Sequence, residues 1–231
     1  MAVVPSPNIW HWPDVYELEN QAQDVEGALF AALPDWTGWD VVDVGCGAGF
    51  HLPRFAESAR TVIGVEPHRP LVTLAERRTE ALPSVQVYAG SAESLPLPDA
   101  SADLVHARTA YFFGAGCEPG ISEAMRVLRP GGVLVVVDLD ATAHPYGEWM
   151  CADLKNYRPH RVEQFFVDAG FDIRRVDTRW EFASRDALAS VLGIEFAPRV
   201  ARAALRATTG LTLDVRYRVH TLRKPRGLIV S

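Results

Sequence analysis

Short apolar runs alternate with longer mixed segments over the first two thirds of this 231-residue chain. The runs are rich in valine, which is typical of buried strands, and the segments between them have helical lengths. Strands that alternate with helices from Asp40 to about Leu139 predict an α/β fold, with helices on both faces of a parallel sheet. The predicted strands lie at residues 41–44, 61–66, 85–90, 103–105 and 133–137.

The pattern changes in the last third of the chain. Polar and apolar residues partly alternate in Phe171–Phe182 and in Leu211–Lys224, which predicts two strands that are antiparallel neighbours at one edge of the sheet. The link between them, at about 184–207, is expected to form two helices broken near Pro198. At the other end, prolines interrupt the first residues and Val15–Leu33 has helical character.

A glycine-rich turn follows the first predicted strand, with the pattern Asp43-x-Gly45-x-Gly47-x-Gly49 and a helix expected from about Leu52. Glycine permits positive φ where the chain reverses, and it removes the Cβ that would keep a ligand away from the backbone. The helix after the turn points unpaired N–H groups toward whatever lies against the loop. The loop is therefore predicted to bind a small molecule.

The spacing of this loop differs from the dinucleotide pattern G-x-G-x-x-G, because Phe50 occupies the sixth position counted from Gly45. The carboxylate of Asp43 suits a ligand with a cationic amine and repels a pyrophosphate. The pattern resembles motif I of the class I S-adenosylmethionine methyltransferases, whose ligand carries an α-ammonium group and a sulfonium.

The resemblance extends over residues 40–140. Glu66 lies 21 positions after Gly45, at the end of the second predicted strand, where an acid can accept both ribose hydroxyls. Ser91–Asp99 resembles the family's loop after the third strand, and Arg126–Gly132 resembles its turn before the fifth. The family implies a Rossmann-like sheet of seven strands in which only the last is reversed. We expect one domain, with an N-terminal helical lid at 1–35, a cofactor-binding core at 36–140, and an acceptor-side region at 141–231 that contains the helical insertion.

The resemblance implies that the cofactor is S-adenosylmethionine. It also implies which residues contact each part of that molecule. The methionine end is expected to meet the motif I loop, and the ribose is expected to meet the end of the second strand. Cys46 is interpreted as a small residue that fits the loop and not as a catalyst. The residues concerned are Asp43, Gly45, Cys46, Gly47 and Gly49 for methionine, and Glu66 and Pro67 for ribose.

Adenine recognition departs from the family, which commonly has Asp where this chain has Ser91. The Ser91 side chain with the Ala92 backbone is one candidate, and Glu93 is the other. Ala107 and Arg108 follow the fourth strand beside the expected methionine moiety. Arg108 is a candidate partner for the cofactor carboxylate, and a structural salt bridge is the alternative.

Aromatic residues follow the fourth and fifth strands, at the sheet edge where ligands bind in this architecture. They suit a planar or apolar acceptor, although aromatic residues at these spacings are as often core. Trp10 and Tyr16 are expected to close over the site as part of the lid. The candidate substrate-binding residues are Trp10, Tyr16, Phe112, Phe113, Asp138, Tyr146 and Trp149.

His144 and Tyr111 are the candidate catalytic residues. An imidazole titrates near neutral pH and suits a general base, whereas a surface position is the alternative for His144. Asp138, Asp140 and Glu148 are candidate anchors for an amine substrate.

The sequence lacks the motifs of several methyltransferase classes that act on other acceptors. Enzymes of this fold that methylate amino groups of nucleic acids and proteins carry Asn or Asp-Pro-Pro-Tyr/Phe where this chain reads Arg108-Thr109-Ala110-Tyr111. No Pro-Cys nucleophile follows the fourth strand, and the acid of the Mg-dependent catechol-type enzymes is missing there. We therefore expect metal-free methylation of a small molecule on oxygen, nitrogen or carbon.

Net charge and composition limit the kinds of partner and the location that we expect for this chain. A net charge of −6 argues against nucleic acid. Residues 199–231 hold eight Lys or Arg and one acid, which we interpret as a solvated helix face in preference to an anion-binding surface. The longest apolar stretch is too short to span a membrane, no secretory signal is visible, and three scattered cysteines fit the cytoplasm.

Two alternative functions stay open for this chain. One is a non-catalytic S-adenosylmethionine-binding regulator or scaffold, and the other is an NAD(P)-dependent oxidoreductase. The sequence leaves the oligomeric state undetermined.

Overall fold

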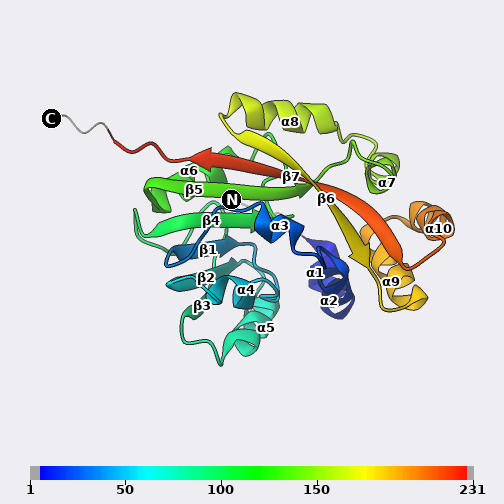
Figure 1. The fold of residues 1–231 in the computed structure, drawn as a ribbon, viewed down its shortest axis with the longest axis horizontal. Helices are drawn as coiled ribbons and strands as arrows, with labels where there is room; N and C mark the ends of the chain where they lie inside the picture. The colour runs from blue at the N-terminus through cyan, green and yellow to red at the C-terminus, as the bar shows by residue number, and fades with distance from the viewer. Residues whose placement is uncertain (1–5, 228–231) are drawn as a thin grey trace.

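A computed structural model describes residues 6–227 and contains one seven-stranded sheet in the order β3-β2-β1-β4-β5-β7-β6 (Figure 1). β7 runs antiparallel to both of its neighbours, and the other strands are parallel to one another. The expected sheet with only its last strand reversed is therefore confirmed. The strands are β1 Asp40–Val44, β2 Thr61–Glu66, β3 Val85–Ala89, β4 Ala102–Arg108, β5 Leu128–Leu139, β6 Asp172–Glu181 and β7 Thr212–Arg223.

Helices cover both faces of this sheet, which explains the unbroken apolar run of β5. Val133, Val135 and Val137 pack with Phe55 of α4 and other residues in one core cluster. Leu134 and its β5 neighbour Val136 pack in a second cluster with residues of α6 and α8. Successive side chains of a strand point to opposite faces, so both faces of β5 need apolar residues. These helices are α4 Leu52–Ala56, α5 Arg69–Thr79, α6 Glu118–Val127, α7 Tyr146–Asp153 and α8 Pro159–Asp168.

The helical insertion lies between β6 and β7, as expected, and forms α9 Arg185–Glu195 and α10 Pro198–Ala207. Ser184 caps α9 by accepting the Ala187 N–H at 3.1 Å. Pro198 occupies the first turn of α10, where the missing N–H costs nothing. The break predicted at this proline is thus the boundary between two helices.

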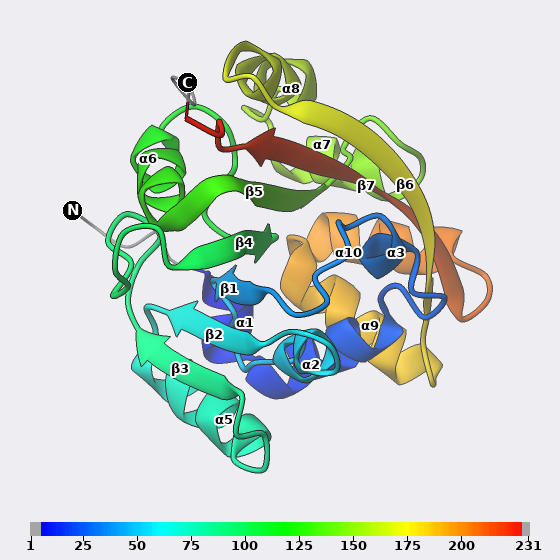
Figure 2. The same ribbon diagram turned by 60° about the vertical axis from the view of Figure 1, so that its left-hand side comes forward.

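The N-terminal segment forms α1 Pro7–His11, α2 Pro13–Ala22 and α3 Ala28–Ala31. The helical character predicted from Val15 onward is interrupted, because Asp24 and Gly27 adopt positive φ between α2 and α3. The Asp24 carboxylate accepts the Leu29 N–H, with 3.0 Å to each oxygen. α2 packs against α9 (Figure 2), so the N-terminal helices and the helical insertion contact each other beside the sheet.

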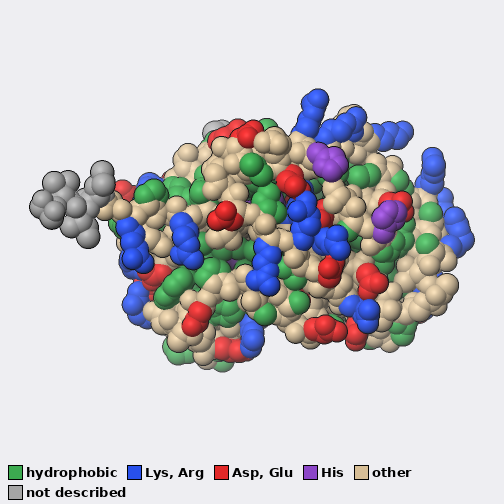
Figure 3. Space-filling view, turned by 45° about the horizontal axis from the view of Figure 1, so that its top comes forward, with side chains coloured by type: hydrophobic (Ala, Val, Ile, Leu, Met, Phe, Trp, Pro, Cys, Tyr) green, Lys and Arg blue, Asp and Glu red, His purple; other side chains and the backbone are tan. Residues whose placement is uncertain are grey.

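On the face that carries α8 and β6, basic and acidic side chains are interspersed (Figure 3). This view shows no extended field of a single sign. Within residues 6–227, no helix combines the length and the apolar character that crossing a bilayer requires. Nor do the His, Cys, Asp and Glu side chains of this range form a group of three or more that could hold a metal ion.

His220 of β7 is a buried histidine with no hydrogen-bond partner on either ring nitrogen within the described chain. Its ring stacks on Phe166 of α8, with 4.1 Å between the ring centroids. Burial, followed by the charges of Arg218 and Arg175, lowers the pKa of His220 to about 3. The folded protein therefore holds this side chain neutral.

We expect His220→Phe to reduce the loss of stability in acid. Between the unfolded-state pKa of about 6.5 and the folded value of about 3, the unfolded chain binds the extra proton, so stability falls as pH falls. This contribution is at most about 1.4 kcal/mol per pH unit. Urea unfolding of both proteins from pH 4 to 7 measures it, and equal pH slopes would contradict the assignment.

Candidate functional site

A cavity lies at the carboxyl ends of β1, β2 and β4, beneath α1 and α2. It holds about 1040 Å³ of space, its open mouth included. The cavity is lined by Ser6, Ile9, Trp10, Tyr16, Asn20, Gln23, Val44, Gly45, Cys46, Gly47, Ala48, Phe50, His51, Glu66, Pro67, Gly90, Ser91, Ala92, Glu93, Arg108, Thr109, Ala110, Tyr111 and Phe113.

The glycine loop after β1 has the backbone that its sequence predicts. Gly45, Gly47 and Gly49 have φ values of 73°, 56° and 77°, in the region that side chains with a Cβ rarely adopt. A Cβ on Gly45 would lie 2.5 Å from the Cβ of Ala110. The loop therefore needs glycine both for its turn and for its contact with the loop after β4. Gly49 packs on Ala75 of α5 and does not line the cavity.

Glu66 at the end of β2 is 4% exposed and lines the cavity. One carboxylate oxygen accepts the Gly47 N–H at 3.2 Å, and the other accepts the His68 N–H at 2.9 Å. Burial raises the pKa of Glu66, although these two N–H groups oppose the shift. Each oxygen can accept a further hydrogen bond, which suits a ligand with two adjacent hydroxyls.

Asp43 lies behind the loop, paired in register with His106 of β4. Its Oδ1 is 2.7 Å from His106 Nδ1, and both side chains are almost fully buried. Asp43 is not among the cavity-lining residues, so the structure shows it tying β1 to β4 just below the turn. Its direct contact with a cofactor amine stays a prediction.

The loop after β4 is strained. Thr109 and Tyr111 have φ values of 47° and 56°, at a cost of order 1–3 kcal/mol for each residue other than glycine. Tyr111 packs its ring against Gly120 and donates its hydroxyl to Glu93 at 2.9 Å. Such strain is often found at binding sites, and here it holds two predicted site residues in contact.

The cavity brings together most of the predicted cofactor residues and part of the predicted acceptor wall. Among the former, Ser91, Ala92 and Glu93 all line it, which leaves the choice between them as adenine partners open. Trp10 stacks on His68 with 4.6 Å between ring centroids. The predicted residues that line the cavity are Trp10, Tyr16, Gly45, Cys46, Gly47, Glu66, Pro67, Ser91, Ala92, Glu93, Arg108, Tyr111 and Phe113.

Several predicted residues lie elsewhere. The side chain of His144, the candidate base, is 74% exposed and sits 3.1 Å from Glu148, so neither residue faces the cavity. Tyr146 is buried and donates to Glu195 at 2.9 Å. Phe112 is almost fully buried and packs in a core cluster, where its ring makes an edge contact with Tyr111 at 5.2 Å between centroids. Ala107 and Trp149 also pack in the core clusters and outside the cavity lining.

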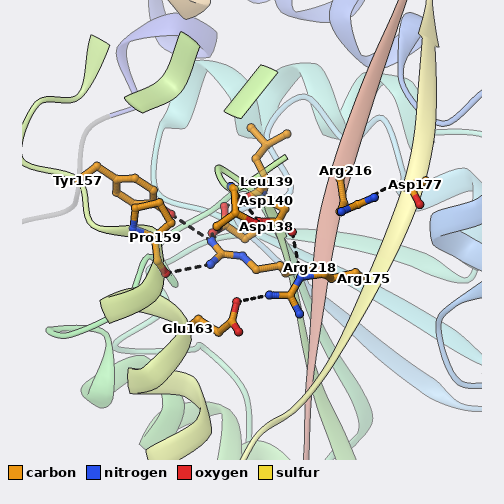
Figure 4. Close-up of polar contacts among 11 residues, drawn as sticks. Asp138, Leu139, Asp140, Tyr157, Pro159, Glu163, Arg175, Asp177, Arg216 and Arg218 are labelled. Atoms are coloured by element: carbon orange, nitrogen blue, oxygen red, sulfur yellow. Dashed lines mark hydrogen bonds and ion pairs between the residues drawn. The ribbon is translucent and has the colours of Figure 1, made fainter. Parts of the chain in front are cut away.

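Asp138 near the end of β5 and Asp140 just after it also lie outside the cavity lining, and both are paired with arginines (Figure 4). Asp138 accepts a hydrogen bond from Arg218 at 2.9 Å, and Asp140 accepts one from Arg175 at 3.1 Å. Arg218 also contacts the Tyr157 hydroxyl at 3.0 Å. These carboxylates hold β5 to β6 and β7, and they are not available as anchors for an amine in the cavity.

Sequence reasoning missed some lining residues for which a signal existed. Asn20 and Gln23 share one face of α2 with the predicted residue Tyr16, at helical spacing. His51 follows the glycine pattern by two positions. Ile9, Phe50 and Thr109 also line the cavity, but nothing in their local sequence marked them.

Comparison with known proteins identifies the domain around this cavity. Residues 42–136 match the family model described as a methyltransferase domain. The chain carries a methyltransferase domain. Solved structures that share its fold include S-adenosylmethionine-dependent methyltransferases and a geranyl diphosphate methyltransferase in complex with S-adenosylmethionine, so the resemblance found in the sequence is confirmed.

Individual relatives of this methyltransferase domain vary in coverage. A probable S-adenosylmethionine-dependent methyltransferase of Mycolicibacterium smegmatis is 38% identical over 43% of this chain and 37% of its own length. Malonyl-[acyl-carrier protein] O-methyltransferase of Enterobacter lignolyticus is 29% identical over 87% of this chain and 74% of its own. The chain spans only about a third of the first two curated relatives it matches.

Solved structures share the fold of the methyltransferase domain. A methyltransferase of Thermotoga maritima, described as a possible histamine N-methyltransferase, superposes with a TM-score of 0.61 at 20% identity. The superposition covers 94% of this chain and 98% of the other.

The residues of the cavity fit S-adenosylmethionine. Gly45 and Gly47 line the cavity without a Cβ, and Glu66 presents a buried carboxylate with free lone pairs beside them. Glu66 would hold the ribose hydroxyls, and the backbone of Gly45–Gly47 would lie against the methionine end.

We expect Gly45→Ala to lower the affinity for S-adenosylhomocysteine by about tenfold or more, since the new Cβ must displace Ala110. Gly38→Ala is the matched control, because Gly38 has the same φ of 73° and no described atom within 4 Å of its Cβ position. Calorimetric titration measures both variants. Equal losses of affinity would show that the close approach of the two loops is unimportant.

Proposed function

We propose that this protein transfers the methyl group of S-adenosylmethionine to a small organic acceptor, without a metal ion. One observation carries the proposal: a single cavity is lined both by the glycine loop with Glu66 and by aromatic side chains. Trp10 lies beside His68, Tyr16 lies next to Thr109 of the loop after β4, and Phe113 belongs to that loop. The arrangement has a place for a cofactor and a second place for an acceptor beside it.

The protein's part in such a reaction is binding and alignment. When bound, the cofactor supplies a methyl group on a sulfonium, which reacts by in-line displacement. Glu66 and the glycine loop hold the cofactor, and the aromatic walls orient the acceptor. Alignment alone is worth roughly 7–11 kcal/mol in well-oriented reactions, so neither a covalent nucleophile nor a metal is required.

The N-terminal helices act as a lid in this proposal. Ile9 reaches the glycine loop so closely that a Cβ on Gly47 would lie 2.7 Å from its Cδ1. Asn8 donates to Glu195 of α9 at 2.6 Å, which fastens α1 to the helical insertion. The lid closes the cavity on the side opposite the sheet and keeps water from the reacting groups.

The partners follow from the same site. A cavity of this size admits a small molecule and not a folded nucleic acid, and the net charge of −6 supports the same choice. Cys46, Cys117 and Cys151 are free thiols, which supports a cytoplasmic location. The relative from Enterobacter lignolyticus is named an O-methyltransferase, which supports methyl transfer to oxygen as one chemistry for this chain.

Calorimetric titration with S-adenosylhomocysteine, with NADH and NADPH as controls, is the first test. Micromolar binding of S-adenosylhomocysteine alone supports the proposal, and binding of a nicotinamide nucleotide overturns it. Transfer of radiolabelled methyl from S-adenosylmethionine to phenols, carboxylic acids or amines then tests catalysis. Cofactor binding without transfer to any acceptor would favour a non-catalytic regulator or scaffold.

We expect Glu66→Gln to weaken S-adenosylhomocysteine binding by about 1.5–3 kcal/mol, the range for hydrogen bonds to a charged group. Because burial raises the pKa of Glu66, wild-type affinity should fall as the pH drops and this carboxylate takes up a proton. Affinity of the Gln variant should not show that fall. Glu57→Gln, at an exposed carboxylate that pairs with Arg54, is the control and should bind like the wild type.

A further inference from the structure

Arg108 at the end of β4 is a buried cation that lacks a charge partner. It is 9% exposed and, within residues 6–227, the only Lys or Arg that lines the cavity. One terminal nitrogen donates to Gln23 of α2 at 2.7 Å, and its buried Nε has no partner in the described chain. Its guanidinium also lies over the Tyr217 ring, 5.4 Å from the centroid.

The nearby acids do not neutralise this guanidinium. None of the ion pairs found within residues 6–227 includes Arg108. Burial, and after it the neighbouring Glu195, raises the pKa of Glu19 well above its usual range, which favours its neutral form. Asp24 directs both oxygens to the N–H of Leu29 at the start of α3. A buried cation without a partner is costly, so an anion in the cavity would offset that cost.

His51 lines the same cavity two positions after the glycine pattern. It is flanked by aromatic rings, with 5.6 Å to the centroid of Phe30 and 5.1 Å to that of Phe50. Burial, followed by the charges of Arg108, His106 and Arg78, lowers the pKa of His51 well below its usual value. At neutral pH the imidazole is therefore uncharged and keeps one nitrogen free to accept a proton.

We propose that the methyl acceptor carries an acidic oxygen, of a phenol or a carboxylic acid, which Arg108 binds as an anion and from which His51 takes the proton where one is present. This inference rests on the proposed methyl transfer and narrows its substrate class to O-methylation of acidic acceptors. It also replaces His144 as the candidate base and moves Arg108 from the cofactor to the acceptor.

The step balances without a further reagent. The O–H proton of a phenol moves to the free nitrogen of His51, and the oxygen lone pair forms the new O–C bond. The C–S bond breaks with its electron pair left on sulfur, which removes the positive charge of the sulfonium. His51 then returns its proton to solvent. A carboxylic acid is already ionised at neutral pH and needs only Arg108.

A pair of probes tests the anion site in the wild-type protein. Benzoate and benzamide have nearly the same shape and differ in charge. In the presence of saturating S-adenosylhomocysteine, we expect benzoate to bind about tenfold or more tightly than benzamide. Equal binding would overturn the proposal while leaving cofactor binding, and with it the proposed function, intact.

Arg108→Gln tests whether the guanidinium binds the carboxylate of the acceptor or that of the cofactor. We expect the variant to lose the preference for benzoate and to keep its affinity for S-adenosylhomocysteine within about twofold. A parallel loss of S-adenosylhomocysteine affinity with benzoate binding retained would assign the guanidinium to the cofactor and refute the proposal. Should the variant fail to fold, the wild-type probe pair still decides the question.

His51→Gln tests the base, with His144→Gln as the matched control at an exposed histidine. With 4-methylphenol, which is protonated at neutral pH, and benzoate as acceptors, we expect His51→Gln to lower kcat for the phenol by about a hundredfold and to change kcat for benzoate little. His144→Gln should resemble the wild type with both. An equal loss for both acceptors would indicate a structural role for His51 and overturn its assignment. Nuclear magnetic resonance titration of the His51 ring, which should show a pKa well below the usual value of a histidine, supplies a readout independent of turnover.

Discussion

The close contact between two turns, the glycine loop after β1 and the loop after β4, is the constraint on which the rest of the site depends. Gly45 packs against Ala110 at a distance that leaves no room for a side chain. Below the contact, the Asp43–His106 pair fastens the same two strands. Because β1 and β4 are neighbours in the sheet, this junction fixes the floor of the cavity and the direction in which Arg108 leaves its strand.

Two kinds of polar group serve different purposes around that floor. Glu66 is held by backbone N–H groups and keeps free lone pairs, as a ligand-binding carboxylate requires. Asp138 and Asp140 accept hydrogen bonds from Arg218 and Arg175, respectively, and these ion pairs stabilise the edge of the sheet. The distinction is one of unsatisfied hydrogen-bonding capacity and not of residue type, since all three are acids at or next to the carboxyl ends of strands. Arg108 and His51 belong to the first kind, because both line the cavity and neither takes part in an ion pair within residues 6–227; the Nε of Arg108 has no hydrogen-bond partner in the described chain.

The N-terminal helices and the helical insertion complete the site from outside the sheet. α2 supplies Tyr16, Asn20 and Gln23 to the cavity and also packs on α9. Gln23 connects this lid to the floor through its hydrogen bond with Arg108. Any movement of α2 therefore changes both the walls around an acceptor and the orientation of the guanidinium beneath it, which couples access to the cavity with its electrostatics.

The sequence by itself determined the order of strands and helices along the chain, the reversed last strand, the helical insertion, and the glycine loop and Glu66 that line the cavity. Those features depend on local signals: apolar periodicity, glycine spacing, and an acid at the end of a strand. The acceptor half was decided by tertiary structure. Asp138 lies near the end of β5 and pairs with Arg218, and His144 follows the same strand but is exposed, whereas His51 and Gln23 reach the cavity from distant segments. Which polar side chains stay unpaired depends on partners that are far apart in the chain, and no local pattern encodes that pairing.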